Sequence, residues 1–147
     1  NYDDTTEAAN MLNLKEDAYY RVVSFHSIPE DQKEKYSLEQ LDEVDIIADQ
    51  ISMFYPKNHI YKNVSQIVML QKMDSDKEDD DSRKRLNELI DIVKKSISKR
   101  DQNTNFNIGV GEVVKGYRNL KSSYKQSRVA MKFMKIAKKL LEILINQ

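Results

Sequence analysis

The segment AYYRVVSFHSI, residues 18–28, places the strongest limit on the folds open to this chain. It is rich in aromatic and β-branched residues, and no helical stripe of apolar residues fits it. Both alternating faces of such a strand would be largely apolar, which is typical of a strand in the middle of a sheet. The segment therefore predicts a central β-strand.

The flanking segments predict helices and a hairpin. A capping-box pattern at Asp4–Glu7 predicts a short N-terminal helix that starts there. Ser37 has the same capping pattern, and an apolar stripe then continues in three- and four-residue steps until Pro56 ends the helix. Residues 58–73 predict two strands that are joined by a tight turn near Lys62 and Asn63.

The second half of the chain repeats the alternation of helix and strand. An amphipathic helix is expected after the acidic run at residues 74–81, followed by a strand at residues 105–110 and a long helix from near Arg118. After the N-terminal helix the order is therefore β-α-β-β-α-β-α. This order predicts a single α+β domain over residues 1–147, with a ferredoxin-like βαββαβ core and an antiparallel sheet that carries helices on one face.

All three glycines of the chain, Gly109, Gly111 and Gly116, lie within eight positions. Gly109 falls in a predicted strand, where glycine marks a bulge or the close approach of another backbone. Gly111 is expected in a turn that requires a positive φ. A phosphate-binding loop is the alternative, but the glycine spacing matches neither the dinucleotide fingerprint nor the P-loop.

Composition excludes several kinds of site. The chain has no cysteine and only two histidines, so disulfides, thiolate metal sites and a cysteine nucleophile are ruled out, and no set of zinc ligands with recognisable spacing is present. No apolar run approaches the roughly 20 residues that a membrane span requires. Net charge is zero, but residues 1–50 carry 13 acidic and 4 basic residues, whereas residues 101–147 carry 3 acidic and 9 basic ones. We expect no metal, no cofactor and no membrane partner.

The end of the predicted sheet and the start of the last helix carry a recognisable pattern. Its members are Ile108, Gly109, Gly111, Leu120, Ser123, Tyr124 and Ala130. The pattern resembles the end of the GGDEF-like domain in bacterial transcriptional regulators of the purine-catabolism (PucR) and sugar-diacid (CdaR) types. The chain departs from it at Gln126, Ser127 and Met131, where Glu, Ala and Leu are usual, and each change keeps a similar size.

The resemblance implies a regulatory domain cut from a longer cytoplasmic protein. Its partners would be the adjacent domains of the same regulator, and DNA would be contacted only through a helix-turn-helix beyond residue 147. The apolar end of the last helix, residues 140–145, should pack against this domain. A second copy, which would form a homodimer, and the downstream domain are the alternative partners.

Diguanylate cyclases share this core, and their chemistry needs a Gly-Gly-Asp/Glu-Glu-Phe turn between the second and third strands. The corresponding turn here, residues 61–66, has no glycine and no carboxylate, and the first strand ends in His26 rather than a metal-binding Asp. We therefore expect no enzymatic activity, with an active cyclase as the least supported alternative. The other alternative is a module that binds a small effector or nucleotide near Lys62, Asn63, Gly109 and Gly111.

Overall fold

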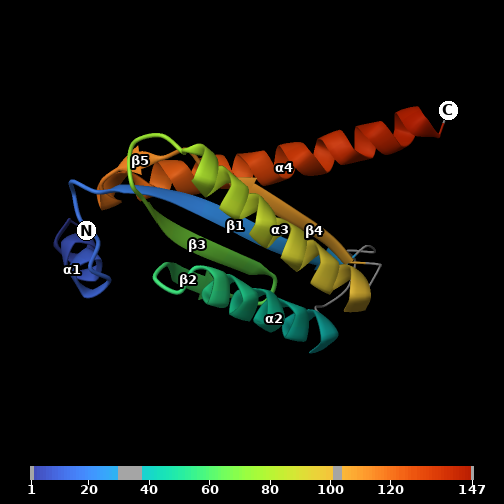
Figure 1. The fold of residues 1–147 in the computed structure, drawn as a ribbon, viewed down its shortest axis with the longest axis horizontal. Coiled ribbons are helices and arrows are strands. Elements are labelled where there is room, and N and C mark those ends of the chain that lie inside the picture. Colours follow the sequence, from blue (N-terminus) through green and yellow to red (C-terminus); the bar gives the residue numbers. More distant parts are fainter. Residues whose placement is uncertain (1, 30–37, 101–103, 147) are drawn as a thin grey trace.

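The computed structural model describes residues 2–29, 38–100 and 104–146. Figure 1 shows an antiparallel sheet with helices on both sides and one helix that projects past the sheet. The elements in chain order are α1 (Tyr2–Met11), β1 (Tyr19–Pro29), α2 (Leu38–Phe54), β2 (His59–Lys62), β3 (Gln66–Met73), α3 (Asp80–Arg100), β4 (Thr104–Val110), β5 (Val114–Lys115), the 3-10 helix η1 (Tyr117–Asn119) and α4 (Leu120–Ile145). The predicted α+β fold, with its ferredoxin-like order of elements, is confirmed.

β1 is the central strand, as its two apolar faces predicted. The strand order is β2-β3-β1-β4, and every pairing is antiparallel. The β1–β3 ladder runs from Tyr19↔Met73 to His26↔Gln66. The two-residue strand β5, which sequence reasoning did not predict, extends the β4 side of the sheet by pairing with the first two residues of β1.

One face of the sheet carries the main hydrophobic core. Alternate residues of β1 and β3 point to this face and meet the apolar sides of α2 and α3. The fully buried members of this core include Val23, Phe25, Ile67, Met69, Ile47, Ile51, Leu89 and Val93. Two amphipathic helices on one face are what the sequence pattern predicted.

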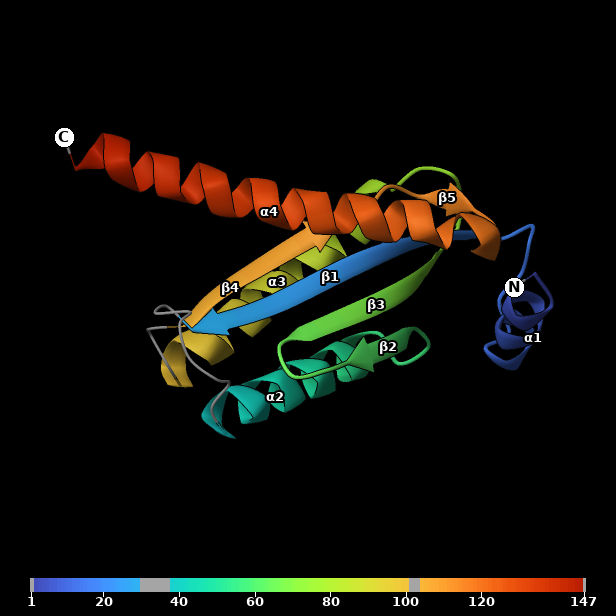
Figure 2. The ribbon, with the colours of Figure 1, turned by 180° about the vertical axis from the view of Figure 1, so that it is seen from behind.

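The opposite face of the sheet is covered by α4, which lies in front of β1 and β4 when the molecule is seen from behind (Figure 2). Only the first part of this helix rests on the sheet, because its C-terminal turns extend past the strands (Figure 1). α4 therefore has one segment that packs on the sheet and another that projects from it.

The two helix-capping predictions fare differently. α1 begins at Tyr2 and already contains Asp4, so the prediction that the capping box at Asp4 starts this helix is wrong. The predicted cap Ser37 lies outside the described residues, and α2 begins at the next residue, Leu38.

Candidate functional site

Gly109 and Gly111 allow the backbone of α4 to approach the sheet. A Cβ atom at Gly109 would lie 1.8 Å from the carbonyl oxygen of Ser127, and one at Gly111 would lie 2.1 Å from the carbonyl oxygen of Ser123. The close approach predicted for Gly109 is confirmed. The prediction of a positive φ at Gly111 is wrong, because among the described glycines only Gly116 has one, at 81°. Glycine is needed at position 111 because the backbone of the last helix passes too close for a side chain.

Two serine hydroxyls on α4 complete this contact. Ser123 Oγ accepts a hydrogen bond from the Val22 amide at 2.9 Å and donates one to the Glu112 carbonyl at 2.7 Å. Ser127 Oγ lies 2.7 Å from Ser24 Oγ on the central strand. Both α4 serines are fully buried. We call Gly109, Gly111, Ser123 and Ser127 the α4 latch, because these four residues fix the helix to β1 and β4.

The family-pattern residues do not all belong to the latch. Gly109, Gly111 and Ser123 do, whereas Ile108 points to the other face and packs against the core under α2 and α3. Leu120 is the first residue of α4, and Ala130 is half-buried along it. The pattern therefore specifies mainly how α4 sits on the sheet. Ser127 was noted in the sequence as a departure, and only the structure shows its buried partner.

The turn between β2 and β3 is closed by its own side chains. Asn63 Oδ1 accepts hydrogen bonds from the amides of Ser65 and Gln66 at 3.2 and 3.0 Å, which is a common turn-stabilising arrangement. Lys62 Nζ lies 2.7 Å from Asp45 Oδ1, and this hydrogen bond and charge raise the pKa of the Lys62 amine. Both residues thus hold the turn in place.

The four residues of the predicted ligand region are not brought together. Lys62 and Asn63 lie at the end of β2 and just beyond it, whereas Gly109 lies in β4 and Gly111 just after it. β2 and β4 are the two outer strands of the order β2-β3-β1-β4, so two strands separate the pairs. The glycines also lie under α4.

A polar cluster instead joins this turn to α4. The Tyr124 hydroxyl accepts hydrogen bonds from Gln66 Nε2 at 3.4 Å and from Arg128 Nη1 at 3.1 Å. The hydrogen bond from Gln66, followed by the hydrogen bond and charge of Arg128, lowers the pKa of the Tyr124 phenol despite partial burial. His26 Nε2, near the end of β1, lies 3.3 Å from Ser65 Oγ. We call His26, Ser65, Gln66, Tyr124 and Arg128 the turn cluster.

The turn cluster brings together the end of β1, the β2–β3 turn and α4. Sequence reasoning placed Tyr124 in the family pattern and treated Arg128 as one of the basic residues of the last helix. It did not pair the two, although their spacing of four residues places them on one side of a helix. The cluster has a cation, a phenol, an amide, an imidazole and a hydroxyl, but it has no carboxylate. Within residues 2–29, 38–100 and 104–146, no three His, Cys, Asp or Glu side chains are grouped so that they could hold a metal ion.

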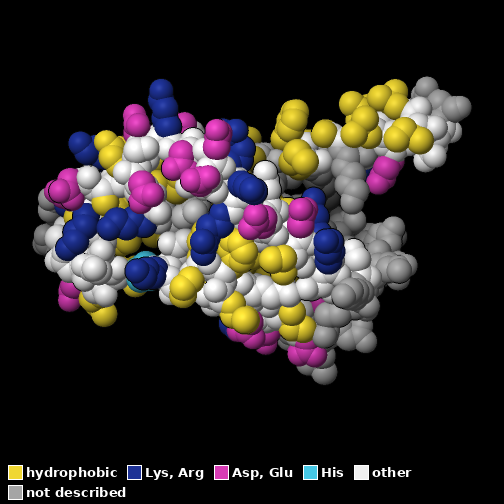
Figure 3. Space-filling view, in the orientation of Figure 1, with side chains coloured by type: hydrophobic (Ala, Val, Ile, Leu, Met, Phe, Trp, Pro, Cys, Tyr) yellow, Lys and Arg dark blue, Asp and Glu magenta, His cyan; other side chains and the backbone are white. Residues whose placement is uncertain are grey.

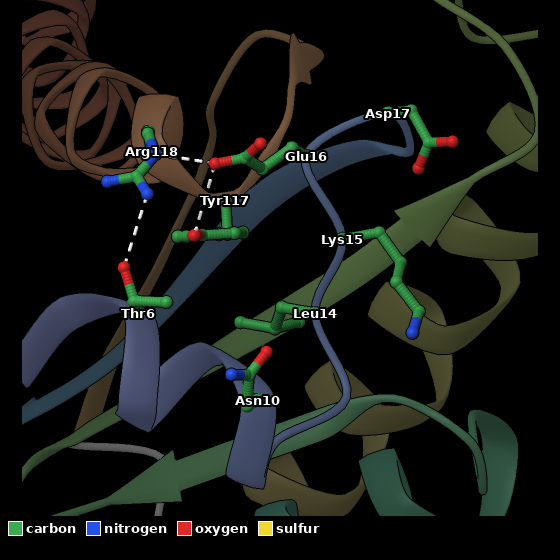
Figure 4. A pocket seen from close by; sticks show the side chains of 8 residues that line it. All are labelled: Thr6, Asn10, Leu14, Lys15, Glu16, Asp17, Tyr117 and Arg118. Atoms are coloured by element: carbon green, nitrogen blue, oxygen red, sulfur yellow. Dashed lines mark hydrogen bonds and ion pairs between the residues drawn. The ribbon is translucent and has the colours of Figure 1, made fainter. Parts of the chain in front are cut away.

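A second junction links the N-terminal segment to the start of α4. Arg118 Nε lies 2.8 Å from Glu16 Oε1, and Arg118 Nη2 donates to Thr6 Oγ1 at 3.2 Å (Figure 4). The Tyr117 hydroxyl donates to the same Glu16 oxygen at 3.3 Å. The hydrogen bond from Arg118, its charge and the hydrogen bond from Tyr117 together lower the pKa of the Glu16 carboxyl. We call Thr6, Glu16, Gly116, Tyr117 and Arg118 the N-terminal junction.

Gly116 makes this junction compact. Its φ of 81° suits glycine, and a Cβ atom there would lie 2.7 Å from the Glu16 carbonyl oxygen. Beside the junction is an open hollow of about 600 Å³. Figure 4 shows that Arg118, Glu16, Tyr117 and Thr6 point toward one another, whereas Lys15 and Asp17 point away from Arg118.

A family model that describes the GGDEF-like domain matches residues 1–133. The chain belongs to the GGDEF-like domain family. The match to the GGDEF-like domain includes the whole sheet, the α4 latch, the turn cluster and the N-terminal junction, whereas the last twelve residues of α4, 134–145, lie beyond it. A comparison with curated proteins gave no match for this GGDEF-like domain. In the part of it that the structure describes, no helix has both the length and the apolar character needed to cross a bilayer.

Proposed function

We propose that this GGDEF-like domain is a non-catalytic coupling element in a cytoplasmic bacterial transcriptional regulator of the PucR or CdaR type. In this role it connects a sensing domain on its N-terminal side to a helix-turn-helix on its C-terminal side. The observation that carries the proposal is that Arg118, two residues before α4, holds both α1 and the segment that enters β1. A displacement of the N-terminal segment therefore acts directly on the start of α4.

The contacts downstream of Arg118 support the same role. The α4 latch fixes the next turns of the helix to the central strand through buried hydrogen bonds. The helix then continues without interruption to Ile145. A contiguous set of hydrogen-bonded elements that ends in a rigid helix is a physical route by which two sites can be coupled.

The turn cluster supports the absence of catalysis. Two-metal catalysis on a nucleoside triphosphate depends on carboxylates at fixed positions that hold the metal ions. The β2–β3 turn and the end of β1 meet in this chain, but they meet through Ser65 and His26. Incubation with GTP and Mg²⁺ or Mn²⁺, followed by chromatography of the nucleotides, should leave GTP unchanged. A cyclic dinucleotide product would overturn the non-catalytic part of the proposal.

The hollow beside the N-terminal junction favours a second candidate function, the binding of a small effector. Its volume of about 600 Å³ lies within the range of small-molecule sites. A thermal-shift screen with nucleotides, purine metabolites and sugar acids tests this function. A concentration-dependent rise in melting temperature, lost in Arg118→Ala, supports a binding module. Unchanged melting temperatures across the set argue against it.

The coupling role is tested in the full-length regulator that contains this chain. Arg118→Ala removes the two guanidinium contacts of the junction, and Lys121→Ala removes an exposed charge from the first turn of α4. We expect Arg118→Ala to abolish the response of a transcriptional reporter to the inducing signal while the affinity of the regulator for DNA stays unchanged. Lys121→Ala should respond as the wild type does. A normal response in Arg118→Ala would contradict the coupling role.

A further inference from the structure

The projecting part of α4 exposes a concentration of apolar side chains. Among the α4 side chains that the structure describes, Met131 is the last one buried against the domain, at 6% exposure. Around and beyond it, nine apolar side chains are between 54% and 78% exposed, namely those of Val129, Phe133, Met134, Ile136, Leu140, Leu141, Ile143, Leu144 and Ile145. Figure 3 shows apolar side chains gathered on this projecting end. The predicted packing of residues 140–145 against their own domain is therefore wrong.

Five of these side chains have the spacing of a coiled-coil seam. Val129, Phe133, Ile136, Leu140 and Ile143 follow one another in steps of four, three, four and three residues. We call these five residues the α4 seam, with Phe133 and Leu140 at heptad positions a and the other three at positions d. At 3.6 residues per turn, Val129 lies about 200° around the helix from Ser127. Because Ser127 faces the sheet, the seam lies on the side of α4 that faces away from it.

The residues beside the seam indicate the orientation of a partner helix. Lys132 and Lys139 occupy positions g, whereas Ala130, Ala137 and Leu144 occupy positions e. In an antiparallel pair of identical helices, the g positions face each other, which would bring the lysines of the two helices together. In a parallel pair, each g lysine faces an uncharged e residue. Charge therefore favours a parallel arrangement of identical helices.

We propose that copies of this chain associate in parallel through the α4 seam. Each a or d residue then meets its own counterpart on the next copy, and the polar and basic side of α4 stays in solvent. Leu at position a with β-branched residues at position d favours bundles of more than two helices. The proposal rests only on the geometry of α4, so it stands or falls separately from the signalling role proposed above.

The adjacent residues Leu140 and Leu141 provide a matched pair of variants. They are the same residue type and are 55% and 57% exposed, but only Leu140 belongs to the seam. Sedimentation equilibrium of the whole chain should give a mass that is a multiple of 17.2 kDa. We expect Leu140→Asn to reduce this to the monomer mass and Leu141→Asn to retain the oligomer. Circular dichroism of both variants checks that each has folded.

Two results would overturn self-association. One is a wild-type chain that stays monomeric over the whole range of concentrations. The other is a chain that binds vesicles of anionic phospholipid instead and loses this binding equally in Leu140→Asn and Leu141→Asn. Equal loss would mean that the total apolar surface of an amphipathic helix matters and its heptad spacing does not.

The orientation has its own test, because the chain contains no cysteine. In a parallel bundle the two copies of Ile143 are neighbours, whereas in an antiparallel one Ile143 lies near the opposite end of the partner seam. Mild oxidation of Ile143→Cys should therefore give a covalent dimer on a non-reducing gel. An oligomer by sedimentation that forms no cross-link would overturn the parallel orientation.

Discussion

Ser24 and Ser127 share a hydrogen bond of 2.7 Å between hydroxyls that are both fully buried, one on the central strand and one on α4. Ser127 Oγ also donates to the Tyr124 carbonyl within its own helix, so Ser24 is the donor in the shared bond. This pair joins α4 to the middle of the sheet.

Removal of only one of these hydroxyls should be more harmful than removal of both. In Ser127→Ala the Ser24 hydroxyl stays buried without this partner, and we expect the free energy of unfolding to fall by about 1–3 kcal/mol. The double variant Ser24→Ala/Ser127→Ala removes both polar groups and should be closer to the wild type. Urea unfolding followed by circular dichroism measures the stability of the wild type, Ser127→Ala and the double variant. A double variant less stable than Ser127→Ala would contradict this account.

Gly109→Ala should weaken the packing of α4 on the sheet. The added methyl group would lie 1.8 Å from a backbone oxygen that belongs to a helix, so the helix itself must shift. Overpacking of this kind costs roughly 1–3 kcal/mol or more. Asn107→Ala, two residues earlier on the same strand and half-buried, is the control and should be near neutral. Melting temperatures of the two variants check the difference, and equal values would argue against the close approach as the reason for glycine.

The ion pair between Arg21 and Glu78 should make stability depend on pH. Arg21 is 3% exposed, and its Nε also donates a hydrogen bond to Gln71 Oε1 at 2.7 Å. Burial raises the pKa of the Glu78 carboxyl, but the hydrogen bonds and charges of Arg21 and Arg83 outweigh it, so the pKa lies below its ordinary value. The ionised carboxylate therefore contributes its full stabilisation above the pKa of the unfolded chain, and this contribution is lost as the pH falls through the folded pKa.

Glu78→Gln tests this pair. It leaves the Arg21 charge buried without its counter-ion, which typically costs about 3–5 kcal/mol near neutral pH. The variant should also lose less stability than the wild type between neutral pH and pH values below the ordinary glutamate pKa. Glu88→Gln, an exposed residue on α3, is the control. Unfolding curves at a series of pH values give the result, and parallel pH profiles of wild type and Glu78→Gln would show that the pair does not act in this way.

Arg118→Ala should loosen α1 without unfolding the sheet. The guanidinium holds both Thr6 and Glu16, so its loss removes two side-chain contacts of the N-terminal junction and leaves the hydrogen bond from Tyr117 to Glu16. Hydrogen exchange of the α1 amides should become faster, while exchange in β1 and β3 stays slow. Lys121→Ala should leave both regions unchanged. Unaltered exchange in α1 would mean that apolar contacts such as buried Ala9 are enough to hold the helix.

Local patterns were sufficient to predict most of the fold. The apolar character of both faces of β1 identified it as the central strand, and turn residues at Lys62 and Asn63 placed the hairpin correctly. These features depend on residues close together in the sequence. The start of α1 was misplaced because a capping-box pattern also fits the interior of a helix that begins two residues earlier.

The candidate site depended on contacts between distant residues and was predicted less well. Glycine is needed at position 111 because the backbone of Ser123, twelve residues further along the chain, leaves no room for a Cβ atom there. The two halves of the predicted ligand region lie apart because the strand order places β2 and β4 at opposite edges of the sheet. The partner of Ser127 is Ser24, more than one hundred residues away. No local pattern contains this information.

The uninterrupted course of α4 from the latch to Ile145 has a mechanical consequence. The helix acts as a lever whose pivot is the point where Ser127 meets the sheet. At 1.5 Å per residue, a tilt of about 10° at that pivot moves the far end by roughly 5 Å. A rearrangement near Gly109 that is too small to disturb the core is therefore amplified severalfold at the tip.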